Sequence, residues 1–78
     1  MGSVRRNKVE KLLEECGFVK VASFMYEKDG YRVLTEYDPF YVVYTPEGVI
    51  VPISLPNNVS SKCVFNRLMK AINKFLGG

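Results

Sequence analysis

The sequence predicts an α+β fold: a two-layer sandwich in the order α-β-β-β(-β)-α, with an antiparallel meander sheet and both helices on one face. Apolar residues recur with helical spacing in two segments, one near each end of the chain. The residues between these segments are rich in aromatic and β-branched side chains, which favour strands. Short connections separate the strand segments, and connections of this kind join antiparallel neighbours.

The first helix is predicted from Val4 to Cys16. Its apolar stripe follows the 3.6-residue period of a helix at Val9, Leu12, Leu13 and Cys16. Gly17 stands where helices commonly end in the left-handed conformation. The opposite face mixes Lys and Arg with Glu, and we interpret it as a solvated surface.

Three strands are predicted next. Phe18 to Lys28 forms the first, and Asp29-Gly30 follows it as a tight hairpin turn, because a type I′ turn needs positive φ at both central residues. The second strand is Tyr31 to Tyr37. Asp38-Pro39 then interrupts the sheet, since proline lacks a backbone donor and restricts the residue before it. The third strand is Phe40 to Thr45.

A fourth strand is predicted from Val49 to Ile53. It contains Pro52, so it either lies at a sheet edge or ends there. Alternatively, residues 31–45 form one long strand with a bulge near Pro39, which would give three strands. The sequence leaves both arrangements open.

The second helix is predicted from about Ser60 to Leu76, with Asn58 or Ser60 as its N-cap. We expect its core-facing side to carry the apolar residues Phe65, Leu68, Met69, Ile72, Phe75 and Leu76. The opposite stripe carries the basic residues Arg67, Lys70 and Lys74 together with Cys63. Cys63 should therefore be more exposed than Cys16.

The composition suits one globular domain covering residues 1–78. The chain is 47% hydrophobic and 13% aromatic, which is richer than disordered chains are. No apolar run approaches the roughly 18 residues of a membrane span. The N-terminal stretch has no hydrophobic segment of signal-peptide type. We therefore expect a cytoplasmic protein with no membrane partner.

Charge is distributed unevenly along the chain. The formal net charge is +3, but residues 48–78 hold four Lys or Arg residues and no acid. Residues 1–47 hold seven basic and eight acidic residues. Such asymmetry indicates a basic surface that could meet phosphates. The competing interpretation is an ordinary solvated helix face, for which Lys and Arg are common choices.

Catalytic and metal chemistry have little support in the sequence. The chain has no His, the commonest general base and metal ligand. The two cysteines, Cys16 and Cys63, match no metal motif, and we expect free thiols. Acidic residues gather near the predicted hairpin ends, where carboxylates are mostly just solvated. We expect no catalytic residue, no metal and no cofactor.

Two stretches carry a family resemblance: KVEKLLEECGFVKV (Lys8 to Val21) and VIVPISLPNNVSSKCVFNRLMKAI (Val49 to Ile72). They cover about half the chain and resemble the HicA toxin family. The resemblance implies a double-stranded-RNA-binding-like α-β-β-β-α fold and contact with nucleic acid.

The resemblance also has a clear limit. That family cleaves messenger RNA with a histidine in a Gly-Ser-His-type segment, and a chain without histidine can inherit no catalytic residue. The segment 27–47 also looks longer than its counterpart in the family. In double-stranded-RNA-binding domains, a basic cluster at the start of the second helix contacts phosphates. Lys62, with Arg67 nearby, stands at the similar place here.

The sequence thus predicts a small non-catalytic nucleic-acid-binding protein that contacts phosphates through the basic face of its C-terminal helix. The candidate residues are Lys62, Arg67, Lys70, Lys74, Arg5 and Arg6. DNA and RNA are not distinguished. The alternative is a protein-interaction module, or a homodimer assembled through the open sheet face or an edge strand. The open face would carry some of the five tyrosines, which either stack on bases or are ordinary strand residues.

Overall fold

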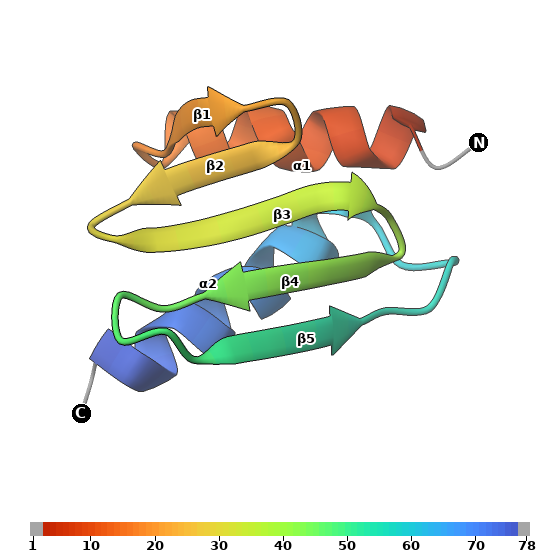
Figure 1. Ribbon diagram of the computed structural model, residues 1–78. Helices are drawn as coiled ribbons and strands as arrows, with labels where there is room; N and C mark the ends of the chain where they lie inside the picture. The colour runs from red at the N-terminus through yellow and green to blue at the C-terminus, as the bar shows by residue number, and fades with distance from the viewer. Residues whose placement is uncertain (1–2, 77–78) are drawn as a thin grey trace.

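A computed structural model describes residues 3–76 and shows a single antiparallel sheet with two helices packed on one of its faces (Figure 1). The five strands form a meander in the order β1-β2-β3-β4-β5. The elements are α1 (Ser3–Glu15), β1 (Val19–Ala22), β2 (Met25–Lys28), β3 (Tyr31–Tyr37), β4 (Phe40–Tyr44), β5 (Ile50–Ser54) and α2 (Ser61–Leu76). The predicted α+β class and the antiparallel meander are confirmed.

Both helices cover the same face of the sheet, as predicted (Figure 1). The covered face is built from alternate strand residues, because successive side chains of a strand point to opposite faces. Tyr26, Val33 and Val43 lie side by side on β2, β3 and β4, and all three are buried. The helices contribute the buried residues Val9, Leu13, Val64, Leu68 and Ile72. These side chains form one core between the sheet and the helix layer.

The strand count differs from the prediction at the N-terminal side of the sheet. Residues 18–28 do not form one strand: the chain reverses at Ser23-Phe24 and makes the β1–β2 hairpin. Phe24 has a φ of 64°, a value that favours glycine. Tertiary contacts hold this turn, because the Thr35 amide donates to the Phe24 carbonyl at 2.9 Å and the Arg6 guanidinium lies 4.7 Å above the Phe24 ring.

The alternative of one long strand over residues 31–45 is wrong. β3 and β4 pair antiparallel, with Tyr37 opposite Phe40, so the chain turns at Asp38-Pro39.

The prediction for Pro52 is confirmed, since β5 is an edge strand of the sheet. Within residues 3–76, neither helix has the length and apolar content of a membrane span.

The local signals for the turns and helix ends are confirmed. Gly17 has a φ of 104°, and its amide donates to the Glu14 carbonyl while the Phe18 amide donates to the Leu13 carbonyl. This pair of bonds is the Schellman arrangement that ends a helix. Asp29 and Gly30 have φ of 54° and 83°, as a type I′ turn requires. The Ser60 hydroxyl caps α2 by accepting a bond from the Cys63 amide at 3.2 Å.

Candidate functional site

The basic stripe of α2 is the best-formed part of the predicted site. Burial of Val64, Leu68 and Ile72 fixes the rotation of the helix against the sheet. The residues on the outer side of the helix must then face solvent. Arg67, Lys70 and Lys74 are all exposed, and their spacing of three and seven residues places them on one stripe.

This stripe borders a groove between α2 and the edge strand β5. The groove, which we call the α2–β5 groove, has a volume of about 550 Å³. The helix contributes the cations Arg67, Lys70 and Lys74 to its lining. The remaining lining is apolar and comes from both elements: Val51, Pro52, Ile53, Ala71 and Phe75. The groove therefore combines an apolar floor with a cationic border.

The charge of the groove is uncompensated within the part of the chain that the structure describes. No acidic side chain lines it. Among residues 3–76, the ion pairs are Arg5–Asp38 and Arg32–Glu27, and neither involves a cation of α2. Cations of like sign on one stripe repel each other, and a bound anion would relieve that repulsion. The arrangement suits a ligand with several negative charges.

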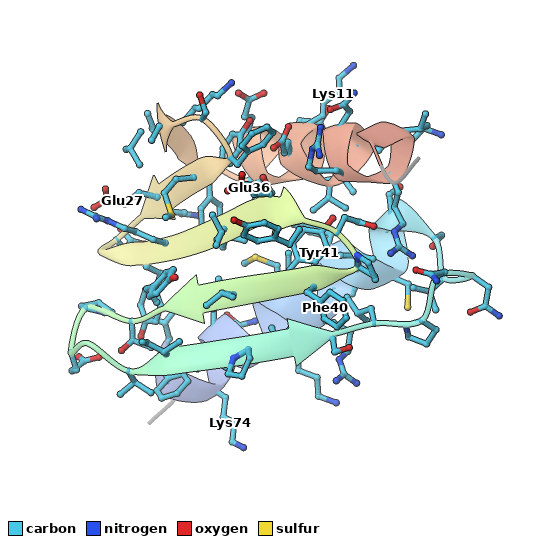
Figure 2. The ribbon with its side chains drawn as sticks, turned by 45° about the vertical axis from the view of Figure 1, so that its right-hand side comes forward. Lys11, Glu27, Glu36, Phe40, Tyr41 and Lys74 are labelled. Atoms are coloured by element: carbon cyan, nitrogen blue, oxygen red, sulfur yellow. The ribbon has the colours of Figure 1, made fainter. Side chains whose placement is uncertain are left out.

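Lys62 lies on a different surface from the stripe. It lines a second hollow, of about 370 Å³, between the N-terminal turn of α2 and the outer side of α1. Lys8, Lys11 and Glu15 of α1 line the same hollow. Figure 2 shows Lys11 and Lys74 extending from opposite sides of the molecule. The predicted set is thus divided: Arg67, Lys70 and Lys74 are brought together, and Lys62 is grouped with α1.

Arg5 has a structural role that the sequence did not reveal. Its side chain is only 13% exposed and forms a two-point ion pair with Asp38, with Nη2–Oδ1 and Nε–Oδ2 distances of 2.8 and 3.1 Å. Its Nη1 group donates to the carbonyls of Pro56 and Val59 at 2.9 and 3.0 Å. Because these bonds use nearly all its donors, Arg5 forms a largely buried clasp with Asp38, and we leave it out of the proposed surface.

The electrostatics of this clasp follow from its hydrogen bonds. The bond to Asp38 raises the pKa of the Arg5 guanidinium, against the opposing effect of burial. Burial by itself would raise the pKa of the Asp38 carboxyl, but bonds from Arg5 and the Tyr41 hydroxyl hold it below its ordinary value. Burial, the hydrogen bond to Asp38 and the Asp38 charge together raise the pKa of Tyr41. The clasp is therefore an ionised pair with a neutral tyrosine.

Arg6 is also engaged by its own fold. It is partly buried, and its guanidinium stacks on the Phe24 ring at 4.7 Å. Its Nε atom is buried without a hydrogen-bond partner. The residue supports the β1–β2 turn and stands apart from the α2–β5 groove, so we leave it out of the proposed surface.

Most tyrosines cannot act as a stacking platform. Tyr26, Tyr31 and Tyr41 are no more than 5% exposed, because they lie on the face that the helices cover. Burial, together with the charges of Glu10 and Glu14, raises the pKa of Tyr26 to about 12. The strand interpretation of these three residues is therefore the one that the structure supports. Tyr37 is the most exposed of the five, at 60%.

Phe75 is the aromatic residue whose predicted core position was wrong. It was expected in the core, yet it is 39% exposed, and Leu76 beside it is 58% exposed. The last turn of α2 lies at the β5 edge of the sheet, where few strand residues remain to cover it (Figure 1). Helical periodicity assigns a residue to a face but does not show where the facing sheet ends. Val64, which periodicity did not select, is fully buried instead.

Other reactive groups are scattered over the described residues. Cys16 and Cys63 are free thiols, and Cys63 is the more exposed, as predicted. Residues 3–76 contain no group of three Cys, Asp or Glu side chains arranged to hold a metal ion.

Comparisons with known proteins give no relatives: no family model, curated protein or solved structure matches the chain. The assignment of a function therefore depends on the geometry of the groove and its charges.

Proposed function

We propose that this chain is a small non-catalytic nucleic-acid-binding protein that contacts phosphates through the basic stripe of α2. One observation carries the proposal: Arg67, Lys70 and Lys74 are exposed on one stripe, line a groove and have no acidic neighbour within it. Phosphates are the common biological anions that recur along a chain, and a row of cations complements them. A cytoplasmic location and the resemblance to HicA-type folds remain part of this proposal.

The mode of contact follows from the two kinds of cation. Arg67 offers a planar fork of donors that suits two phosphate oxygens, whereas Lys70 and Lys74 act as flexible point charges. The stripe from Arg67 to Lys74 extends about 10 Å along the helix, given a rise of ~1.5 Å per residue. None of these contacts reads base sequence, so we expect affinity with little sequence preference.

The proposal is tested by the salt dependence of binding. Fluorescence anisotropy with duplex RNA, duplex DNA and single strands should show binding at about 50 mM salt that weakens steeply as salt rises. Three phosphate contacts predict a log–log slope of about −2 to −3, because each contact releases a counterion. Comparison of the affinities for the RNA and DNA probes decides between the two nucleic acids. An absence of binding to every strand at ~50 mM salt would disprove the proposal.

Self-association is a second candidate function, and the uncovered face of the sheet favours it. Met25, Leu34, Val42 and Pro52 lie in one row across four strands on that face. Nearby, Ile50 is 62% and Phe40 57% exposed, and Figure 2 shows Phe40 on the side of the sheet away from the helices. An apolar face of this kind often marks an interface, and we propose a second copy of the chain as its partner.

For this second candidate, Ile50→Glu should weaken the dimer at least ~10-fold, because it would bury a carboxylate without a partner. Sedimentation equilibrium over a wide concentration range measures the change. Val4→Glu is the matched control, since Val4 is an exposed valine on α1, in the other layer. A wild-type chain that stays monomeric at the highest concentration would contradict self-association, and so would equal effects of the two substitutions.

A further inference from the structure

We infer that the α2–β5 groove receives a base of a single-stranded nucleic acid, stacked on Phe75, while the cations of α2 hold the adjacent phosphates. This inference rests on the proposed function and specifies its substrate class. It uses the part of the groove that phosphate contacts leave unexplained, namely the apolar floor.

The floor of the groove is large enough and apolar enough for a planar ring. Its volume of about 550 Å³ falls within the roughly 300–1,000 Å³ of small-molecule sites. Val51, Ile53 and Ala71 are partly or fully buried and form the deeper lining. Pro52 and Phe75 are exposed, so their rings are accessible from outside. A ligand made only of anions would leave this surface in contact with water.

Phe75 is placed to serve both kinds of contact. It follows Lys74 directly in the chain, and the two residues line the same groove. The other large exposed aromatic residues of the described chain, Tyr37 and Phe40, face each other across the β3–β4 turn and are not part of the groove. Phe75 is therefore the aromatic residue that accompanies the basic stripe.

The combination favours a single strand over a duplex. In a duplex the bases are paired and stacked inside, and only phosphates and groove edges reach a protein surface. A single strand can turn a base toward the protein while its phosphates stay on a basic surface, and aromatic side chains then stack on that base. A groove with an apolar floor and a cationic border provides both contacts at once.

An acidic peptide is the competing occupant. It would satisfy the cations, but carboxylate side chains offer no flat ring for Phe75. The apolar and aromatic lining therefore favours a nucleic acid, and an acidic peptide serves as one arm of the test.

The test uses Phe75→Trp as a reporter, because the chain has no tryptophan of its own. An oligo-deoxythymidine probe of about 12 nucleotides should quench this tryptophan, since site sizes of ~4–16 nucleotides are usual for such surfaces. An abasic strand of equal length carries the same phosphates without bases. It should bind about 5- to 100-fold more weakly, which corresponds to the loss of one stacked base.

Phe75→Ala should reduce affinity for the oligo-deoxythymidine probe by a similar factor, about 5- to 100-fold, and leave affinity for the abasic strand unchanged. Leu76→Ala is the matched control, because Leu76 is exposed in the same helical turn but does not line the groove. Thermal unfolding followed by circular dichroism verifies that both variants are folded.

Each outcome separates the inference from the proposed function. Equal affinity for the two strands, without quenching, would overturn base stacking while phosphate binding stands. Failure of both strands to bind at low salt would overturn the proposed function itself. A poly-glutamate peptide that binds as tightly as the oligo-deoxythymidine probe would replace the nucleic acid with an acidic peptide and overturn the inference.

Discussion

Replacement of Asp38 by alanine is expected to lower the free energy of unfolding by up to about 3–5 kcal/mol, because removal of one partner from a largely buried ion pair leaves the other charge uncompensated. Asp38 is only 4% exposed in its side chain and is bonded to both Arg5 and the buried Tyr41 hydroxyl. The alanine variant would leave the largely buried guanidinium without its counter-ion and the tyrosine without an acceptor. For a chain of 78 residues, a loss of this size is a large part of the whole stability.

The control for this prediction is the second ion pair of the described chain. Glu27 and Arg32 are 3.5 Å apart, with side chains 33% and 56% exposed. Glu27→Ala should cost no more than about 1 kcal/mol, because exposed pairs contribute little. Urea unfolding measures both variants. A cost for Asp38→Ala no larger than that for Glu27→Ala would show that the clasp does not stabilise the fold.

A second variant tests whether the cost arises from the abandoned charge. Arg5→Met combined with Asp38→Leu removes both charges and leaves apolar groups in their place. This double variant should lose less stability than Asp38→Ala alone, because no unpaired charge remains buried. A double variant that is less stable than Asp38→Ala would indicate that the bonds from Arg5 to the Pro56 and Val59 carbonyls contribute more stability than the unpaired guanidinium costs.

The pH dependence follows from the same cluster. The pKa of Asp38 in the folded chain lies below its ordinary value of 3.8, so the folded state binds fewer protons than the unfolded state in this range. The stabilisation is complete above that ordinary value and is lost as the pH falls through the folded pKa. Wild-type stability should therefore decline on acidification, and Asp38→Ala should remove the part of the decline that belongs to this carboxyl.

Features that depend on neighbouring residues were predictable from the sequence. Gly17, Asp29-Gly30 and Ser60 each mark a backbone conformation that only a few residue types favour, and each stands where its signal placed it. The missing backbone donor restricted Pro52 to a sheet edge or a strand end, and Pro52 lies in the edge strand β5. These signals are local, so no tertiary information was needed to use them.

Features that depend on distant contacts were not predictable. Arg5 and Asp38 are 33 residues apart, and nothing near Arg5 in the chain distinguishes it from an exposed arginine. The turn at Ser23-Phe24 contains no Gly, Asn or Pro, so the sequence gives no local signal for it. It is held instead by contacts from Arg6 and Thr35, which are distant in the sequence. The separation of Lys62 from the basic stripe could not be predicted, because it depends on where α1 packs against the start of α2. The candidate site was therefore predictable only in part. Helical periodicity predicted the basic stripe, but the groove beside it could be found only from the position of the edge strand β5 against α2.

Charge reversal on the stripe is expected to have the largest functional effect. Lys70→Glu combined with Lys74→Glu should reduce affinity for a single-stranded probe on the order of 100-fold at ~50 mM salt, because two counterion-releasing contacts are lost. Fluorescence anisotropy at several salt concentrations measures this loss. The magnitude of the log–log slope should fall by about 1.4 for a single strand, which shows that contacts, and not only the overall field, have been removed.

The matched control changes the net charge by the same amount but at positions outside the groove. Lys11→Glu combined with Lys20→Glu reverses two exposed lysines, one on α1 and one on β1, outside the α2–β5 groove. A uniform field would make the two double variants equally weak, whereas direct phosphate contact requires the stripe variant to lose more affinity and more salt dependence. If the control loses more, the phosphates lie against α1, and the hollow shared by Lys8, Lys11 and Lys62 is the binding surface in place of the groove.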